Sequence, residues 1–196
     1  MPSDPTVLAF DTSAAHCAAA LLRGGQITVS RAEAMTRGQA ERLMPLLEEV
    51  LAEAGCTWQD LDAVGVGTGP GNFTGIRISV SAARGLALGL GVPAIGVDGF
   101  DALANLAPEG QVPAIRAPRE QAYVRLPGEE PKLISTETPQ LPAALYYCED
   151  PETQARSIAK IATRRIGTQI EAPAPLYVRP ADAAPSKDVP PILLDG

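Results

Sequence analysis

The alternation of short apolar runs and longer amphipathic stretches predicts an α/β protein. Short apolar runs are typical of strands, and they lie at residues 6–10, 17–22, 26–32, 63–66 and 93–97. Helices are expected where apolar residues repeat at helical spacing, at residues 39–54, 73–90, 99–106 and 151–166. The first three strands are joined by turn residues, so they predict an antiparallel meander.

Residues 61–98 form the best-defined unit of the chain: a strand, a glycine-rich turn, a long helix and a second strand. This order predicts a βαβ crossover, whose two strands are parallel. Gly91, followed by Pro93, marks the end of the helix, because glycine readily ends a helix and proline cannot continue one.

The glycine-rich turn at residues 67–75 has two interpretations. Glycine lets the backbone approach another group closely, and the free N–H groups of a helix N-terminus attract anions. The turn therefore fits either a phosphate or nucleotide neighbour or a tight connection with nothing bound. It lacks the Gly-Lys-Ser/Thr ending of a P-loop, and at Thr74 it misses the third glycine of the dinucleotide fingerprint. Asp98 lies where a ribose-binding acid would be expected, which leaves a Rossmann alternative open.

An acid and two hydroxyls, Asp11, Thr12 and Ser13, end the first strand. They could hold a magnesium ion or a phosphate, but the same residue types form turns by themselves, and taken alone they favour a turn. The candidate nucleotide-proximal residues are Asp11, Thr12, Ser13, Gly69, Gly71, Thr74 and Gly75.

Helices 39–54 and 73–90 carry more apolar surface than one contact with a sheet requires. In the second helix only a narrow stripe is polar, and exposed apolar patches usually mark contacts. We therefore predict that both helices pair with equivalent helices of a partner, through Leu43, Leu47, Val50, Ile76, Arg77, Val80, Ser81, Ala83, Arg84 and Ala87. The alternative is that the second half of the chain covers them.

The chain is expected to divide into a first half at 1–108 and a second half at 109–196. The second half predicts strands at 112–115, 122–126 and 132–136 and a buried apolar segment at 145–148, followed by the helix at 151–166. The tail from Ala172 is rich in proline and is expected to be irregular.

Composition narrows the possible functions. A net charge of −7 and a pI of about 4.8 disfavour a main RNA-binding subunit, because such proteins normally carry a basic patch. Aromatic residues make up only 4% of the chain, so stacking platforms for bases are scarce. Cys17, Cys56 and Cys148 are far apart and predict free buried thiols in a reducing compartment. With one histidine, His16, the sequence predicts no metal site. It has neither a signal-peptide pattern nor a membrane-spanning run, so we expect a cytoplasmic protein with no membrane contact.

Four sequence blocks resemble the TsaB family, also called YeaZ. They are FDTS at 10–13, RLMP at 42–45, GTGPGNFTGIRISVSAARGLALGLGVPAIGVD at 67–98 and LYVRP at 176–180. The resemblance extends over residues 6 to about 105, and the block at 69–79 is its most specific part.

The resemblance implies an actin-like/sugar-kinase fold, with two ribonuclease-H-like halves of which the second is reduced. It further implies a non-catalytic partner of TsaD, with the small ATPase TsaE joining, in threonylcarbamoyl transfer to the adenosine beside the anticodon of tRNAs that read codons beginning with A. Members of the family also form homodimers when the partner is absent. By this resemblance the chain binds no cofactor tightly, the complex uses ATP and Mg²⁺, and tRNA is contacted only through the complex.

The sequence departs from the family pattern at two places. Gln39 replaces a common histidine, and Arg116-Ala117-Pro118 stands where relatives often have Asp-Ala-Arg. Two other functions stay open: a stand-alone kinase or ATPase of the same superfold, using Asp11 and the glycine loop, and a Rossmann protein that binds NAD(P).

Overall fold

The computed structural model describes residues 4–137, 143–168 and 171–178. Its larger sheet has five strands in the order β3-β2-β1-β4-β5. These strands are β1 (Val7–Asp11), β2 (His16–Arg23), β3 (Gln26–Ala34), β4 (Ala63–Gly67) and β5 (Ala94–Val97). β1, β2 and β3 are antiparallel neighbours, whereas β4 pairs parallel with both β1 and β5. The predicted meander and βαβ crossover are both confirmed.

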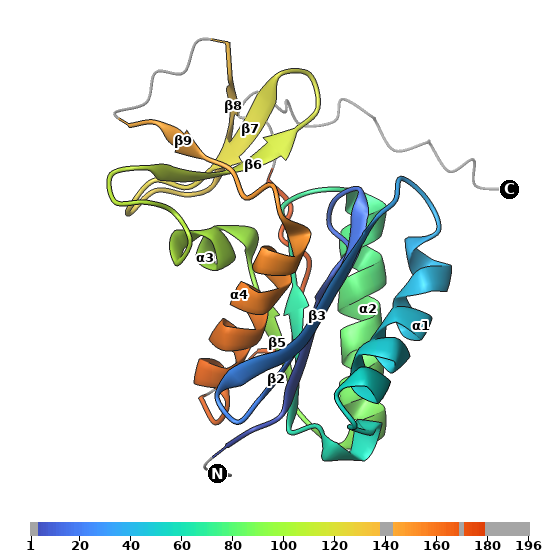
Figure 1. Cartoon of the computed structure of the whole chain (residues 1–196). Coiled ribbons are helices and arrows are strands. Elements are labelled where there is room, and N and C mark those ends of the chain that lie inside the picture. The colour runs from blue at the N-terminus through green and yellow to red at the C-terminus, as the bar shows by residue number, and fades with distance from the viewer. Residues whose placement is uncertain (1–3, 138–142, 169–170, 179–196) are drawn as a thin grey trace, which may run out of the picture.

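Helices cover both faces of this sheet (Figure 1). α1 (Gln39–Glu53) and α2 (Phe73–Leu90) lie on one face, and α4 (Pro151–Arg165) packs on the other. α3 (Gly99–Ala104) follows β5 and contacts α4. Because both faces are covered, β1 and β4 are buried along their whole length, as expected for strands that are apolar at successive positions.

A second, smaller sheet lies at one end of the molecule (Figure 1) and has the order β8-β7-β6-β9. Its strands are β6 (Val112–Ala117), β7 (Gln121–Val124), β8 (Lys132–Ser135) and β9 (Leu145–Tyr146). Its core is small and consists of Val112, Ala114, Ala122 and Val124. The prediction that 145–148 is buried is wrong, because β9 is an edge strand and this segment is only half-buried.

The chain returns to the large sheet after the small one. α4 packs against β1, β2 and β4 through small residues, and a Cβ atom at Gly65 would lie 2.9 Å from the Cβ of Ala162. The absence of a side chain at Gly65 thus lets the helix approach the sheet closely. Residues 151–165, which belong to the predicted second half (109–196), thus pack on the sheet formed by the predicted first half (1–108).

Within residues 4–137, 143–168 and 171–178, no helix combines the length and the apolar character that a membrane crossing needs.

Candidate functional site

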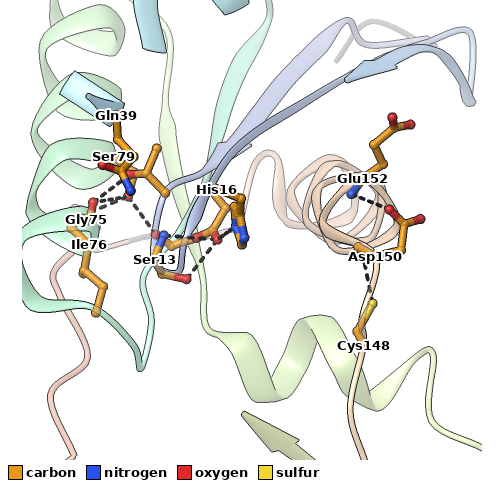
Figure 2. Close-up of polar contacts among 12 residues, drawn as sticks. Ser13, His16, Gln39, Gly75, Ile76, Ser79, Cys148, Asp150 and Glu152 are labelled. Carbon is orange, nitrogen blue, oxygen red and sulfur yellow. Dashed lines mark hydrogen bonds and ion pairs between the residues drawn. The ribbon is translucent and has the colours of Figure 1, made fainter. Parts of the chain in front are cut away.

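The Asp11-Thr12-Ser13 turn is held together by its own side chains. Asp11 ends β1 with its side chain inside the protein, where Oδ2 accepts hydrogen bonds from Ser13 Oγ at 2.9 Å and from Ser13 N at 3.2 Å. His16 Nε2 lies 2.8 Å from the same oxygen, and Figure 2 shows Ser13 and His16 pointing toward one another. The lone histidine of the chain is therefore a structural partner of Asp11.

The second oxygen of Asp11 faces Gly67. Among the described residues it has no hydrogen-bond partner, and a Cβ atom at Gly67 would lie only 2.1 Å from it. A buried carboxylate oxygen without a partner is costly, so it is a place where a ligand atom could be sought. Here the oxygen is enclosed by the chain itself, and the side chain of Asp11 has no exposed surface.

The glycine loop between β4 and α2 packs directly on this turn. A Cβ atom at Gly71 would lie 2.2 Å from the carbonyl oxygen of Ser13, and one at Gly75 would lie 1.9 Å from that of Thr12. Across the same contact, Thr12 Oγ1 donates to Gly75 O at 2.7 Å and Asn72 N donates to Ser13 O at 2.6 Å. These glycines therefore make room for the chain's own backbone, which is the close approach that glycine permits.

The start of α2 is capped from within the chain. The side chain of Asn72 accepts a hydrogen bond from Gly75 N at 2.8 Å, which satisfies one of the N–H groups that an anion would otherwise attract. Within the first turns, Ser79 Oγ donates to Ile76 O at 3.1 Å (Figure 2).

The candidate nucleotide-proximal residues thus come together, but mostly inside the protein. Asp11, Thr12, Ser13, Gly69 and Gly75 are buried, Gly71 is half-buried and Thr74 alone is exposed. As described, these groups bind one another and do not form an open cradle for ATP and Mg²⁺. Their proximity to a nucleotide stays a prediction.

The candidate interface residues divide into two groups. The apolar ones fill the space between the helices and the sheet and are at most 7% exposed: Leu43, Leu47, Val50, Ile76, Val80, Ala83 and Ala87. Only Arg77, Ser81 and Arg84 are exposed. The apolar stripe of each helix therefore faces the core, and a partner must contact the exposed residues beside that stripe. Across the described ranges, no other helix or strand lies over the outer side of α1 and α2 in Figure 1, although residues 171–178 contact the outer side of α2.

The outer face of α2 is cationic and locally apolar. Neither Arg77 nor Arg84 forms an ion pair with any residue that the structure describes, although the chain is acidic overall. Leu88 is 86% exposed and lines a groove of about 650 Å³ with Val92, Pro93 and Pro173, rimmed by Arg84 and Glu171. Exposed arginine beside exposed leucine is a composition that marks contacts between proteins.

Residues 171–178, which we call the C-terminal strap, run over the glycine loop. Leu176 N donates to Thr68 O at 2.8 Å, and Pro173 is buried against Gly96. The strap has no helix or strand, as its proline content predicts, but it is docked on the protein. The sequence analysis did not predict this docking, although residues 176–178 belong to the LYVRP block of the family resemblance. The last two residues of that block, 179–180, lie outside the described residues.

Asp98 has a different role from the one a Rossmann site would give it. Its side chain accepts from Asp101 N at 2.8 Å, which caps α3, and from Arg125 Nη1 at 3.0 Å. Arg125 also donates to Asp101, and Arg165 Nη2 donates to Asp101 at 2.5 Å. Burial alone would raise the pKa of Asp101, but the hydrogen bonds from Arg165 and Arg125 outweigh it and hold that pKa below its usual value. This ion network joins α4 and the residue that follows β7 to the start of α3.

Arg116, at the position where the family resemblance led us to expect an aspartate, does not carry a free charge. It pairs with Glu149, and its guanidinium carbon lies 4.4 Å from the centre of the Tyr147 ring.

Across residues 4–137, 143–168 and 171–178, no three His, Cys, Asp or Glu side chains gather closely enough to hold a metal ion. Cys17 and Cys56 are buried, but Cys148 is half-buried, so the prediction of buried thiols fails there.

Comparisons with known proteins agree with the family resemblance. Residues 28–172 match the family model "TsaD: tRNA N6-adenosine threonylcarbamoyltransferase". The chain is 37% identical over 123 residues to a tRNA threonylcarbamoyladenosine biosynthesis protein TsaB of Haemophilus influenzae, an alignment that covers 60% of this chain and 52% of that protein. It is 30% identical over 213 residues to a tRNA N6-adenosine threonylcarbamoyltransferase of a Jannaschia species, with 91% of this chain and 58% of that protein covered. The chain thus spans about half the length of these curated relatives.

A solved structure also matches most of the fold. YeaZ from Pseudomonas aeruginosa superposes with a TM-score of 0.73 at 29% identity, and the match covers 89% of this chain and 100% of that one. This supports the predicted actin-like α/β fold with a reduced second half. The chain belongs to the threonylcarbamoyltransferase family that the TsaD model describes and, within it, to the TsaB (YeaZ) proteins.

Proposed function

We propose that this chain is a non-catalytic subunit in the synthesis of threonylcarbamoyladenosine in tRNA. It pairs with a TsaD-like catalytic subunit, which a TsaE-like ATPase joins, and the complex transfers a threonylcarbamoyl group to the adenosine beside the anticodon. The substrates are tRNAs that read codons beginning with A. The names of the relatives support the pathway, and the family resemblance supplies the division of labour.

The packing of the glycine loop on the Asp11 turn is the observation that carries this proposal. A kinase or ATPase needs an acid and a glycine loop that open toward the phosphates. In this chain Asp11 is wholly buried, and the glycines at 71 and 75 lie against the carbonyl groups of residues 12 and 13. The same residues that would serve catalysis instead fix the position of α2, whose outer face is left for a partner.

The remaining expectations follow from this role. The chain binds no cofactor tightly, while ATP and Mg²⁺ are used by the complex. It works in the cytoplasm, contacts tRNA only through its partners and forms a homodimer through the same helices when the catalytic subunit is absent. The homodimer and the complex with TsaD should therefore compete.

The direct test is reconstitution. The purified chain, a TsaD-like subunit and a TsaE-like ATPase are mixed with tRNA, ATP, Mg²⁺ and a threonylcarbamoyl donor, and the modified nucleoside is measured. We expect modification only when this chain is present, and no ATP turnover by the chain alone. Turnover by the pure protein that is lost in Asp11→Asn would instead favour the kinase or ATPase alternative.

Surface variants test whether the outer face of α2 binds the partner. Leu88→Asp should weaken binding to the TsaD-like subunit by roughly 30-fold or more, the size expected for a central interface residue, and should leave the fold intact because Leu88 is 86% exposed. Arg164→Ala, at an exposed position on α4, is the matched control on the opposite layer and should bind normally. Normal binding by Leu88→Asp would place the partner elsewhere.

A further inference from the structure

Two distant parts of the chain hold the side chain of Arg77 in one position. The guanidinium carbon lies 3.8 Å from the centre of the Phe73 ring, one helical turn before it. From the C-terminal strap, the hydroxyl of Tyr177 lies 2.9 Å from Arg77 Nε, which donates to it. The ring of Tyr177 stacks on that of Phe73 with 5.0 Å between centres and 28° between planes.

Within this arrangement, only one guanidinium nitrogen of Arg77, Nε, forms a hydrogen bond. Nε is bonded to Tyr177, whereas the two terminal nitrogens have no hydrogen-bond partner within the part of the chain that the structure covers. Arg77 is an exposed residue, so a partner can approach it. A fixed, planar pair of donors matches a carboxylate or a phosphate, both of which bind arginine through two parallel hydrogen bonds.

Arg84 provides an internal comparison. It lies on the same face of α2, two helical turns from Arg77 or roughly 10 Å along the axis. No aromatic side chain or hydrogen bond fixes it among the described residues. Because immobilising a free arginine costs side-chain entropy at binding, a cation that is already held binds a partner more tightly than one that is not.

We propose that Arg77 binds a carboxylate of the partner protein and that Tyr177, through the C-terminal strap, is the residue that positions it. This inference rests on the proposed function, in that it assumes a protein partner on the outer face of α2. It adds the chemistry of the contact and assigns a role to residues 171–178, which lie outside the helices.

The surroundings favour a protein carboxylate over an RNA phosphate. The neighbouring groove is lined mainly by apolar residues, with Leu88 and Pro173 among them, and also by Arg84 and Glu171. A mainly apolar surface suits a protein partner. The chain also carries a net charge of −7, which repels a polyanion over a long range. Arginines without ion pairs beside a mainly apolar groove suit a protein contact that has an acidic side chain at its edge.

A double-mutant cycle tests the proposal. Binding of the TsaD-like subunit is measured by calorimetry for the wild type, Arg77→Ala, Tyr177→Phe and the double variant. We expect Arg77→Ala to weaken binding roughly 30-fold, as for an interface hot spot, and Tyr177→Phe to weaken it about five-fold, as for one lost hydrogen bond. Because Tyr177 acts through Arg77, Tyr177→Phe should have no further effect in the Arg77→Ala background.

Three controls separate this role from general stability. Tyr177→Phe keeps the stacked ring and should keep the thermal midpoint of the wild type. Arg77→Lys keeps the charge but loses the planar pair of guanidinium donors, so it should bind the TsaD-like subunit less tightly than the wild type. Arg84→Ala should weaken binding less than Arg77→Ala. An equal effect of Tyr177→Phe in both backgrounds would overturn the positioning role. Normal binding by Arg77→Ala together with lost binding by Leu88→Asp would overturn the inference while leaving the proposed function intact.

The same variants distinguish the two anions. Binding of the complex to a tRNA transcript that reads a codon beginning with A is measured at two salt concentrations. We expect Arg77→Ala to leave the affinity of the assembled complex for this tRNA unchanged. If Arg77→Ala weakens tRNA binding and leaves the affinity for the TsaD-like subunit unchanged, the partner of Arg77 is an RNA phosphate and the proposal is wrong.

Discussion

The two sheets of this chain differ in how completely they are covered. The large sheet lies between two layers of helices, and its strands β1 and β4 are fully buried. The small sheet has a core of four residues, and its strands β8 and β9 are half-buried or exposed. Around the large sheet the packing is so close that a Cβ atom added at Gly65, Gly67 or Gly75 would lie within 3 Å of a neighbouring atom. The more completely packed part of this molecule is therefore the part that positions α2.

Replacing a glycine should show the largest difference between the two regions. Gly75→Ala places a Cβ atom 1.9 Å from Thr12 O, which either strains or breaks the contact between turn and loop. We expect a loss of roughly 4 kcal/mol or more in the free energy of unfolding, measured by urea denaturation. Gly128, in the small-sheet half, has a φ of +76° and nothing within 4 Å of an added Cβ, so Gly128→Ala should cost only about 1 kcal/mol.

Gly85→Ala is the control on the same helix. Its added Cβ would meet nothing within 4 Å, and alanine favours a helix over glycine by about 1 kcal/mol. This variant should therefore be more stable than the wild type. If Gly75→Ala were as stable as Gly85→Ala, the turn and the loop would not be in contact as described.

The elements of the well-covered large sheet were also predicted more accurately from the sequence than those of the small sheet. Strands β1 and β4 and helices α1 and α2 were predictable within about two residues, because burial imposes an apolar pattern on every position of a covered strand and on one side of a covered helix. In the small sheet, half-buried segments such as 145–148 lack that constraint, and the prediction of burial there was wrong.

The candidate site was less predictable than the fold, for two physical reasons. The same glycines serve a ligand or a close backbone, so residues 67–75 alone could not decide between these uses; the distances to Thr12 and Ser13 favour the backbone. Periodicity also does not tell which side of a helix is covered by its own chain. For this reason Val80 and Ala83, expected at an interface, lie in the core. The strap contact of Tyr177 joins residues 100 positions apart, a distance that no local pattern reports.

The ion network at Asp101 should give a smaller effect that is confined to the small sheet. Arg125→Ala removes the link between β7 and the two carboxylates at 98 and 101. We expect faster hydrogen exchange in β6 and β7 with little change in β1 and β4. Arg116→Ala, which breaks an ion pair in which both side chains are largely exposed, is the control and should have almost no effect.

The same network predicts a dependence on acid. The pKa of Asp101 is lower in the folded protein than its ordinary value of about 3.9. Its contribution to stability is therefore fully present above about pH 4 and is lost as the pH falls through the lowered pKa. Exchange in β6 and β7 should rise in this acidic range for the wild type. In Arg125→Ala, which has already lost part of the network, the rise should be smaller, and an equal rise in both proteins would show that other carboxylates are responsible.

The smallest effect concerns thiol reactivity, which reports the opening of each region without changing its stability. Burial raises the pKa of Cys17 in β2 to about 12, with the nearby Glu33 adding to the increase. Burial also raises the pKa of Cys148, which follows β9 and is only half-buried. Since the thiolate is the reactive form, both should react more slowly than free cysteine at pH 8. Cys148 should nevertheless be labelled first, because a reagent can reach it without opening of the large sheet. Mass spectrometry of peptides from a labelling time course measures both rates, and urea-unfolded protein gives the reference.

Arg125→Ala should accelerate labelling of Cys148 but not of Cys17. Equal acceleration at both positions would mean that the two regions open together, and the contrast between the sheets would then hold for packing but not for local stability.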